Sequence, residues 1–330
     1  MYWLAGKKVY IQAGLHADEP PGFIAVHYLI KLLDEADKAG KIQGEIVLVP
    51  MANPIGLSQW HDDRLVGRYD FSTSINFNRA YPELKDAVAK KIRKKLQKSS
   101  KKNIELIRKA QLECLNELTP VDETQYLKFE LMKMAVDADI VLDLHCDDQA
   151  FMHIYMGTPL WPDATDLAAQ MGSRVTLLAK NSGGEPFDEA CSKIWWELDE
   201  MFENHEIPAA CLSATVELRG TSDVTHDYGS ADAKNLFTFL KRRGYIKGIA
   251  PKLPRLLRDA TPLSAVEHLK ADRPGIVIYR KSLGETIKKG DIVAEILTPQ
   301  ETDPTKRITK VRAKSGGFLF TKNTDRYAKP

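Results

Sequence analysis

The chain has 330 residues, of which 43% are hydrophobic and 28% are charged, and its formal net charge at pH 7 is +2. These values are typical of a soluble globular protein that is long enough for one large domain and one small domain. Because so small a net charge creates no strong field, we expect neither nucleic acid nor an anionic membrane as a partner.

Three features of the sequence favour a cytoplasmic location. No stretch approaches the about 20 consecutive apolar residues that span a bilayer. The opening MYWLAGKKVYIQAG has no basic region before an apolar core, and it has no small-residue cleavage site. We therefore predict no signal peptide. The four cysteines show no paired spacing, which speaks against disulfides and suits a reducing compartment.

The first part of the chain begins with a strand and a helix and continues into a long polar loop. KVYIQAG is apolar and ends in glycine, as a buried strand does, and the apolar residues after it recur at helical spacing. Long loops in compact domains tend to be functional, so the loop is a candidate for substrate contacts. The expected elements are strands at 8–14 and 45–50, a helix at 23–40, the loop at 51–82 and mostly helical structure at 83–137.

A run of basic residues, KKIRKKLQKSSKK at 90–102, lies within this helical region. Its pattern favours a solvated helix face over a surface that binds nucleic acid. The run therefore does not change the expectation of a small-molecule partner.

The next part of the chain alternates between strands and helices. DADIVLDLHC is a nearly continuous apolar run that ends in polar residues, which is typical of a central parallel strand. This alternation predicts an α/β domain with a mostly parallel sheet, whose functional sites lie at the carboxyl ends of the strands. The expected strands are 137–146, 150–156, 174–179 and 210–218, and a helix is expected at 230–244.

The character of the sequence changes near residue 250. A proline-containing connector at 251–272 precedes short strands that are separated by tight turns rich in glycine. This pattern indicates a small all-β module at 273–330. We therefore predict a large domain at 1–250, a linker at 251–272 and a small β domain at 273–330.

His16 and Glu19 form an H-x-x-E pair where the first strand turns into the first helix. Residues three apart at such a turn can converge on one ion, and a catalytic zinc takes three protein ligands. His145 is the best third candidate because it ends the strongest core strand, and Asp143, two residues earlier on the same side, could bind an imidazole. A chance H-x-x-E pair and a structural core histidine remain alternative explanations.

Five segments in order carry a resemblance to a known family. They resemble the motifs of the succinylglutamate desuccinylase/aspartoacylase family of zinc hydrolases, which are relatives of the zinc carboxypeptidases. The combination of H-x-x-E, N-R and D-L-H in this order is specific. The segments are GLHADEPPG (14–22), VPMANPIGL (49–57), GRYDFSTSINFNRAYP (67–82), DIVLDLHC (139–146) and ATVELRG (214–220).

The resemblance implies one Zn2+ per chain, with His16, Glu19 and His145 as its ligands. Glu217 matches the family's catalytic glutamate, which would take a proton from zinc-bound water and deliver it to the leaving nitrogen. Zinc lowers the pKa of its water to about 7, so a nearby carboxylate can move that proton. The alternative explanation for Glu217 is a strand-end salt bridge with Arg219 on the same face.

The resemblance also implies how a substrate is held. Asn78 and Arg79 match the family's Asn-Arg pair and would bind a substrate carboxylate, for which the planar guanidinium is suited. Arg68 matches the arginine that polarises the scissile carbonyl and stabilises the tetrahedral oxyanion. Arg64 is close enough in the sequence to compete for that role, and either arginine could instead lie on the surface.

The fold implied by the resemblance is a zinc-carboxypeptidase-like, mixed, mostly parallel sheet flanked by helices, followed by a small β domain of the barrel-sandwich type. The 1–250 domain would be a zinc hydrolase that cleaves the amide bond of an N-acyl amino acid or a similar small carboxylated amide. Two alternatives remain, namely a metallocarboxypeptidase or amidase that acts on short peptides, and a non-catalytic small-molecule binding protein that retains the fold. The C-terminal module would cap the cleft or build a homo-oligomer.

Overall fold

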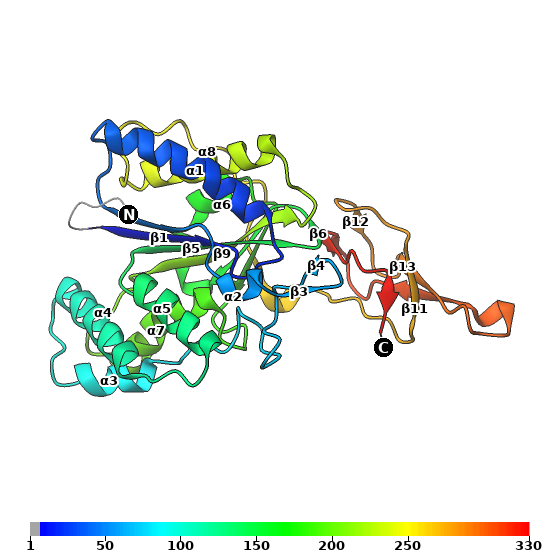
Figure 1. The fold of residues 1–330 in the computed structure, drawn as a ribbon, viewed down its shortest axis with the longest axis horizontal. Helices are drawn as coiled ribbons and strands as arrows, with labels where there is room; N and C mark the ends of the chain where they lie inside the picture. The colour runs from blue at the N-terminus through cyan, green and yellow to red at the C-terminus, as the bar shows by residue number, and fades with distance from the viewer. Residues whose placement is uncertain (1–6, 330) are drawn as a thin grey trace.

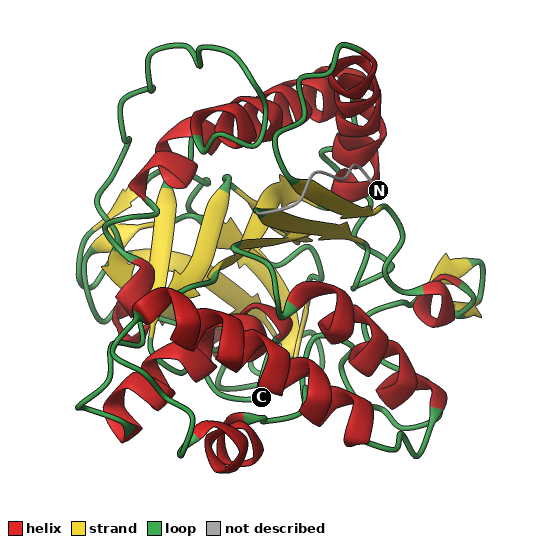
Figure 2. Ribbon diagram, turned by 90° about the vertical axis from the view of Figure 1, so that its left-hand side faces the viewer, coloured by secondary structure: helices red, strands yellow, loops and turns green. Residues whose placement is uncertain are grey.

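The computed structural model describes residues 7–329 of the chain (Figures 1 and 2). Residues 1–6, which belong to the opening examined for a signal peptide and to the 1–250 domain, lie outside this range, as does residue 330. A central sheet lies between two layers of helices, and a separate group of C-terminal strands lies beyond one end of it (Figure 1). The predicted α/β fold with a mostly parallel sheet and a C-terminal β module is confirmed.

The main sheet has the strand order β10-β8-β7-β9-β5-β1-β2. Neighbouring strands run parallel except for β7 and β9, which pair antiparallel. The carboxyl ends of β1, β5 and β9 therefore lie at the same edge. The strands are β1 (Lys8–Ala13), β2 (Glu45–Val49), β5 (Ile140–Asp147), β7 (His153–Gly157), β8 (Val175–Ala179), β9 (Leu212–Gly220) and β10 (Thr261–Pro262).

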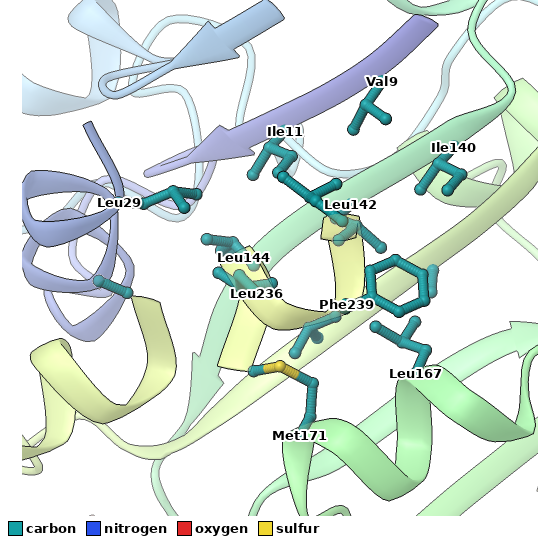
Figure 3. Packing of buried hydrophobic residues seen from close by; sticks show 14 of the residues in the cluster. Val9, Ile11, Leu29, Ile140, Leu142, Leu144, Leu167, Met171, Leu236 and Phe239 are labelled. Atoms are coloured by element: carbon teal, nitrogen blue, oxygen red, sulfur yellow. The ribbon is translucent and has the colours of Figure 1, made fainter. Parts of the chain in front are cut away.

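Helices cover both faces of this sheet (Figures 1 and 2). Side chains of β1 alternate between the two cores, since Val9 and Ile11 belong to one and Tyr10 to the other. Figure 3 shows the first core, in which Leu142 packs among residues from the overlying helices. The first face is covered by α1 (Pro21–Lys38), α6 (Thr165–Met171) and α8 (His226–Arg242), and the second by α3 (Lys85–Ile92), α4 (Ser100–Glu117), α5 (Glu123–Ala135) and α7 (Phe187–Met201).

The basic run at 90–102 does not form one helix face, so that expectation was wrong. It crosses the end of α3, a turn and the start of α4. The buried side chain of Asn103 stabilises the turn, because it both accepts from the backbone N–H of Gln97 at 2.9 Å and donates to its carbonyl at 2.9 Å. Because a side-chain amide fixes this turn, the spacing of apolar residues in the sequence does not reveal it.

Several other elements were not expected from the sequence. Helices α6 and α7 were not predicted, and the loop at 51–82 contains short regular segments. These segments are α2 (Pro54–Leu57), β3 (Trp60–His61) and β4 (Arg64–Leu65), of which the last two form an antiparallel hairpin.

The C-terminal module contacts the large domain through backbone pairing. Strand β16 (Thr321–Lys322) pairs with β6 (Gln149–Ala150), directly after the central strand β5. Within the connector, β10 adds to the edge of the main sheet beside β8. None of the helices in residues 7–329 is long and apolar enough to cross a membrane. The remaining strands of the module are β11 (Gly275–Tyr279), β12 (Thr286–Ile287), β13 (Ile292–Leu297), β14 (Ile308–Arg312), β15 (Gly317–Phe318) and β17 (Tyr327–Ala328).

Candidate active site

His16, Glu19 and His145 form a buried cluster at the carboxyl edge of the sheet. One ligand atom from each side chain lies within 4.8 Å of the other two. Their side chains are at most 4% exposed. The cluster forms because β1 and β5 are parallel neighbours, so the turn after β1 and the end of β5 meet. The sequence-predicted ligand set is thus gathered in one place.

The turn after β1 depends on a glycine. Gly14 has a φ of +74°, in the left-handed region that glycine adopts without strain. A Cβ at this position would lie 2.4 Å from ring carbons of Phe23. The N–H of Glu19 then donates to the carbonyl of His16 at 3.2 Å, and α1 begins at Pro21. This tight turn directs the side chains of the H-x-x-E pair toward each other.

Both imidazoles present Nδ1 to the carboxylate of Glu19. His16 Nδ1 lies 2.8 Å from Oε1, and His145 Nδ1 lies 2.8 Å from Oε2. The opposite nitrogens face acceptors, since His16 Nε2 is 2.7 Å from Asn76 Oδ1 and His145 Nε2 is 2.8 Å from Asp143 Oδ2. These acceptors favour a proton on each Nε2 and leave each Nδ1 lone pair for a metal. Asp143 thus meets an imidazole, as predicted, through an ion-pair contact rather than a well-aligned hydrogen bond.

A buried polar chain supports Asp143 from behind. The hydroxyl of Tyr10 donates to Gln12 Oε1 at 2.7 Å, and Gln12 Nε2 donates to Asp143 Oδ1 at 2.9 Å. Gln12 and Asp143 lie opposite each other in the β1–β5 register. Sequence reasoning missed Gln12 because its role appears only when the strand order is known.

The charges of the cluster favour a bound cation. Burial alone would raise the pKa of Glu19, but His145 and His16 hold it well below its ordinary value. Burial lowers the pKa of His16. Burial alone would also lower the pKa of His145, but Asp143 and Glu19 raise it. The ionised carboxylate of Glu19 thus favours a positive group beside it. Without a metal that group is a proton on His145, which a divalent ion at Nδ1 would replace.

The donor set fits Zn2+. Two imidazole nitrogens and one carboxylate are a common ligand set of catalytic zinc sites, which keep a further position open. The carboxylate of Glu19 is also fixed from outside, by the N–H of Cys146 at 3.0 Å from Oε2 and by Arg68 Nη1 at 2.7 Å from Oε1. The same donors also suit cobalt, nickel or manganese.

The cluster opens into a cavity of about 290 Å³. Glu217, Arg68, Asn78 and Arg79 all line this cavity. The structure therefore brings every sequence-predicted site residue to one place.

Glu217 lies beside the metal cluster, opposite His145 in the β5–β9 register. Burial, followed by the charge of Glu19, raises the pKa of Glu217 to about 8. Its Oε2 is buried and has no hydrogen-bond partner. The alternative of a salt bridge to Arg219 is wrong, because that guanidinium binds Asp232 with contacts of 3.1 and 2.5 Å.

The two competing arginines occupy different places. Arg68 lines the cavity and contacts Glu19, while 46% of its side chain remains exposed. Arg64 lies in β4 on the exposed hairpin and is absent from the cavity lining. Arg68 is therefore the arginine that can reach a substrate beside the cluster.

Asn78 and Arg79 lie on a loop that is tied to the start of α7. Asn78 Oδ1 accepts from the N–H of Phe187 at 2.8 Å, and its Nδ2 is 3.4 Å from His145 Nε2. Arg79 Nη1 donates to the carbonyl of Asn78 at 2.6 Å. The bond to Phe187 fixes the Asn-Arg pair, and it places Asn78 beside His145 of the metal cluster.

A second loop, at 180–186, packs against this pair. The N–H of Ala80 donates to the carbonyl of Gly184 at 2.8 Å. Gly184 has a φ of +78°, and a Cβ there would lie 2.8 Å from Arg79 Cδ. On the other side, the buried Lys128 Nζ donates to the carbonyl of Arg79 at 2.7 Å. These contacts hold the backbone of Arg79, and the missing side chain of Gly184 leaves room for the Arg79 side chain, which lines the cavity.

Sequence reasoning missed several residues of the cavity and of the metal cluster's surroundings. Asn76, which holds His16, carried no motif of its own. Asp188 and Glu189 reach the cavity because α7 begins there, and the helical spacing of apolar residues in 187–201 was the signal that could have revealed this helix. His268 enters from the connector.

Comparison with known proteins connects this geometry to a family. The sequence profile described as "Succinylglutamate desuccinylase/Aspartoacylase catalytic domain" matches residues 5–243. No curated protein sequence matched significantly.

Solved structures share the fold over almost the whole chain. A protein from Shewanella amazonensis assigned to the succinylglutamate desuccinylase/aspartoacylase family has 27% identity and a TM-score of 0.85, covering 99% of this chain and 88% of that one. A second such protein, from Shewanella frigidimarina, has 24% identity and a TM-score of 0.83, with coverages of 98% and 89%. A succinylglutamate desuccinylase from Silicibacter has 20% identity and a TM-score of 0.65, with coverages of 98% and 82%. The last two show a shared fold alone.

Proposed function

The chain belongs to the succinylglutamate desuccinylase/aspartoacylase family, and we propose that it is a zinc-dependent hydrolase of N-acyl amino acids or similar small carboxylated amides. The observation that carries this proposal is the buried cluster of His16, Glu19 and His145, which opens into the same cavity as Glu217. A Zn2+ ion held by these three side chains would supply a Lewis acid that acidifies water and polarises an amide carbonyl.

Glu217 is the proposed general base and acid. Its pKa of about 8 lies near neutral pH, which suits a group that must both accept and release a proton. Oε2 of Glu217 has no hydrogen-bond partner among residues 7–329, so it could take a proton from the attacking water and pass it to the leaving nitrogen.

Arg68, Asn78 and Arg79 are the proposed substrate contacts. The partly exposed guanidinium of Arg68 would donate to the carbonyl oxygen as negative charge develops on it. Arg79 would bind the substrate carboxylate through two parallel N–H groups, and Asn78 would position it beside the metal cluster. Peptides are the second candidate substrates, because an Asn-Arg pair binds a peptide C-terminus equally well.

We propose further that the linker at 251–272 and the β domain at 273–330 close the cavity. Leu263 and His268 of the linker line it, and the pairing of β16 with β6 fixes the β domain beside the end of β5. A cavity of about 290 Å³ that these segments narrow would favour small substrates over long peptides.

The proposal is tested with zinc-loaded protein on a panel of N-acetyl amino acids and short peptides, beside a Glu217→Gln variant. We expect hydrolysis of an N-acyl amino acid and a fall in kcat of about 100- to 10,000-fold in the variant, with unchanged zinc content and Tm. A variant that keeps near-normal turnover would contradict the role of Glu217. A wild-type protein that binds the panel without cleaving it would indicate a binding protein.

A further inference from the structure

Two adjacent, buried carboxyl groups in the cavity have no part in the proposed hydrolysis. Asp188 and Glu189 lie in the first turn of α7 and line the same cavity as the metal cluster. They are only 5% and 4% exposed. Buried carboxylates of this kind are expected to have a cationic or hydrogen-bonding partner.

No cationic side chain in the described part of the chain pairs with either residue. Glu189 Oε1 accepts from the N–H of Ser182 at 2.6 Å, but its Oε2 is buried and has no hydrogen-bond partner. Lys193, one turn further along α7, pairs with Glu83 and Glu185 instead. The unpaired oxygen of Glu189 thus marks a position that a donor outside the protein can fill.

The acidic residues at the start of α7 favour a cationic group over a second carboxylate in that part of the cavity. The whole lining contains the guanidinium groups of Arg68 and Arg79, three imidazoles and four carboxyl groups, those of Asp147, Asp188, Glu189 and Glu217. Burial raises the pKa of Asp188 to about 7 and that of Glu217 to about 8, so neither carries a full negative charge at neutral pH. One carboxylate on a substrate can bind Arg79. A second carboxylate beside α7 would meet the buried carboxylate of Glu189, whereas a cationic group could donate to its unpaired oxygen.

We propose that Asp188 and Glu189 form a subsite for a cation, so that the preferred substrate is an acylated amino acid that also carries an amino or guanidinium group. This inference rests on the proposed function and names its substrate class. The substrate's carboxylate binds Arg79, its amide lies at the metal cluster, and its cationic group donates to Glu189 Oε2 and to Asp188. A substrate without that group leaves the buried Oε2 of Glu189 without a hydrogen-bond partner from residues 7–329, and an unpaired buried polar atom is the condition under which polar sites discriminate most strongly.

The test compares side chains of similar length and different charge. The substrates are Nα-acetyl-ornithine, Nα-acetyl-lysine and Nα-acetyl-arginine, with Nα-acetyl-norleucine as the neutral analogue and Nα-acetyl-glutamate as the acidic one. For the zinc-loaded wild-type protein we expect kcat/KM of the best cationic substrate to exceed that of norleucine by about 100-fold or more. Neutral or acidic analogues that are cleaved as well as the cationic ones would overturn the inference and leave the proposed function intact.

Variants connect the preference to the two carboxylates. We expect Glu189→Gln and Asp188→Asn each to reduce the ratio of cationic to neutral kcat/KM by about 10-fold or more. Glu200→Gln on the same helix is the control, because that side chain is 62% exposed and pairs with Lys180 outside the cavity. An unchanged ratio in both cavity variants would contradict the subsite.

Binding measured without turnover separates this inference from the proposed function. By calorimetry on the wild-type protein, we expect the best-bound of ornithine, lysine and arginine to bind about 10-fold more tightly than norleucine, and Glu189→Gln to remove the difference. If no substrate on the panel is cleaved, the proposed function fails, while this binding difference still supports the subsite. Equal binding of cationic and neutral amino acids would count against the subsite whatever the turnover.

Discussion

Asp143 Oδ2 lies 2.8 Å from His145 Nε2, on the side of the imidazole that faces away from Glu19. This contact sets the ring so that Nδ1 points into the cluster with His16. Gln12 in turn holds the other oxygen of Asp143, so the position of a proposed metal ligand depends on residues in two neighbouring strands. Such outer contacts both orient an imidazole and increase its basicity as a ligand.

Asp143→Ala should weaken metal binding without removing a ligand. We expect zinc affinity to fall by about 10- to 100-fold, because His145 loses the acceptor that orients it. Competition with a chromophoric chelator measures this directly. Asp143→Asn, which keeps an oxygen acceptor of the same size, should recover part of the loss. Equal affinity in wild type and Asp143→Ala would contradict the orienting role.

Arg68→Met and Arg64→Met form a matched pair that tests which arginine polarises the carbonyl. We expect kcat to fall by about 100- to 1,000-fold in Arg68→Met, as for the loss of an oxyanion donor. Arg64→Met should stay within about twofold of wild type, since the residue is on an exposed hairpin. The reverse order in steady-state kinetics would assign the role to Arg64.

Gly184→Ala should reduce activity through Arg79. A Cβ at Gly184 would lie 2.8 Å from Arg79 Cδ, so the guanidinium must move away from its place in the cavity wall. We expect kcat/KM to fall by about 10-fold or more, with KM affected most. Gly183→Ala is the control, because its φ of +87° imposes similar backbone strain, yet nothing lies within 4 Å of its Cβ position. If both variants lose activity equally, strain in the loop is the cause and not Arg79.

Features formed by residues close together in the chain, and features marked by long motifs, are the ones that the sequence predicts best. The H-x-x-E turn and the apolar strand ending in His145 carry their own signals, so the proposed metal ligands could be named from the sequence. The sequence of helix α7 also contains apolar residues at helical spacing, namely Phe187, Cys191 and Trp195. This pattern indicates a helix, although none was predicted there.

Other parts of the site depend on contacts between distant segments. Gln12 acquires its role from the pairing of β1 with β5, and Asp188 reaches the cavity only because the loop at 180–186 packs on the Asn-Arg loop. Asn76 likewise reaches His16 across a long loop. No local pattern of residue types encodes such pairings, so they require the three-dimensional structure.

The central claim is that His16, Glu19 and His145 hold a catalytic metal ion. The most direct measurement is the metal content of purified wild-type protein and of His145→Ala, determined by elemental analysis after equilibration with zinc and removal of the free ion. We expect about one zinc per chain in the wild type and almost none in the variant, with far-ultraviolet circular dichroism unchanged. A wild-type protein that retains no metal, or a variant that retains as much, would contradict the account.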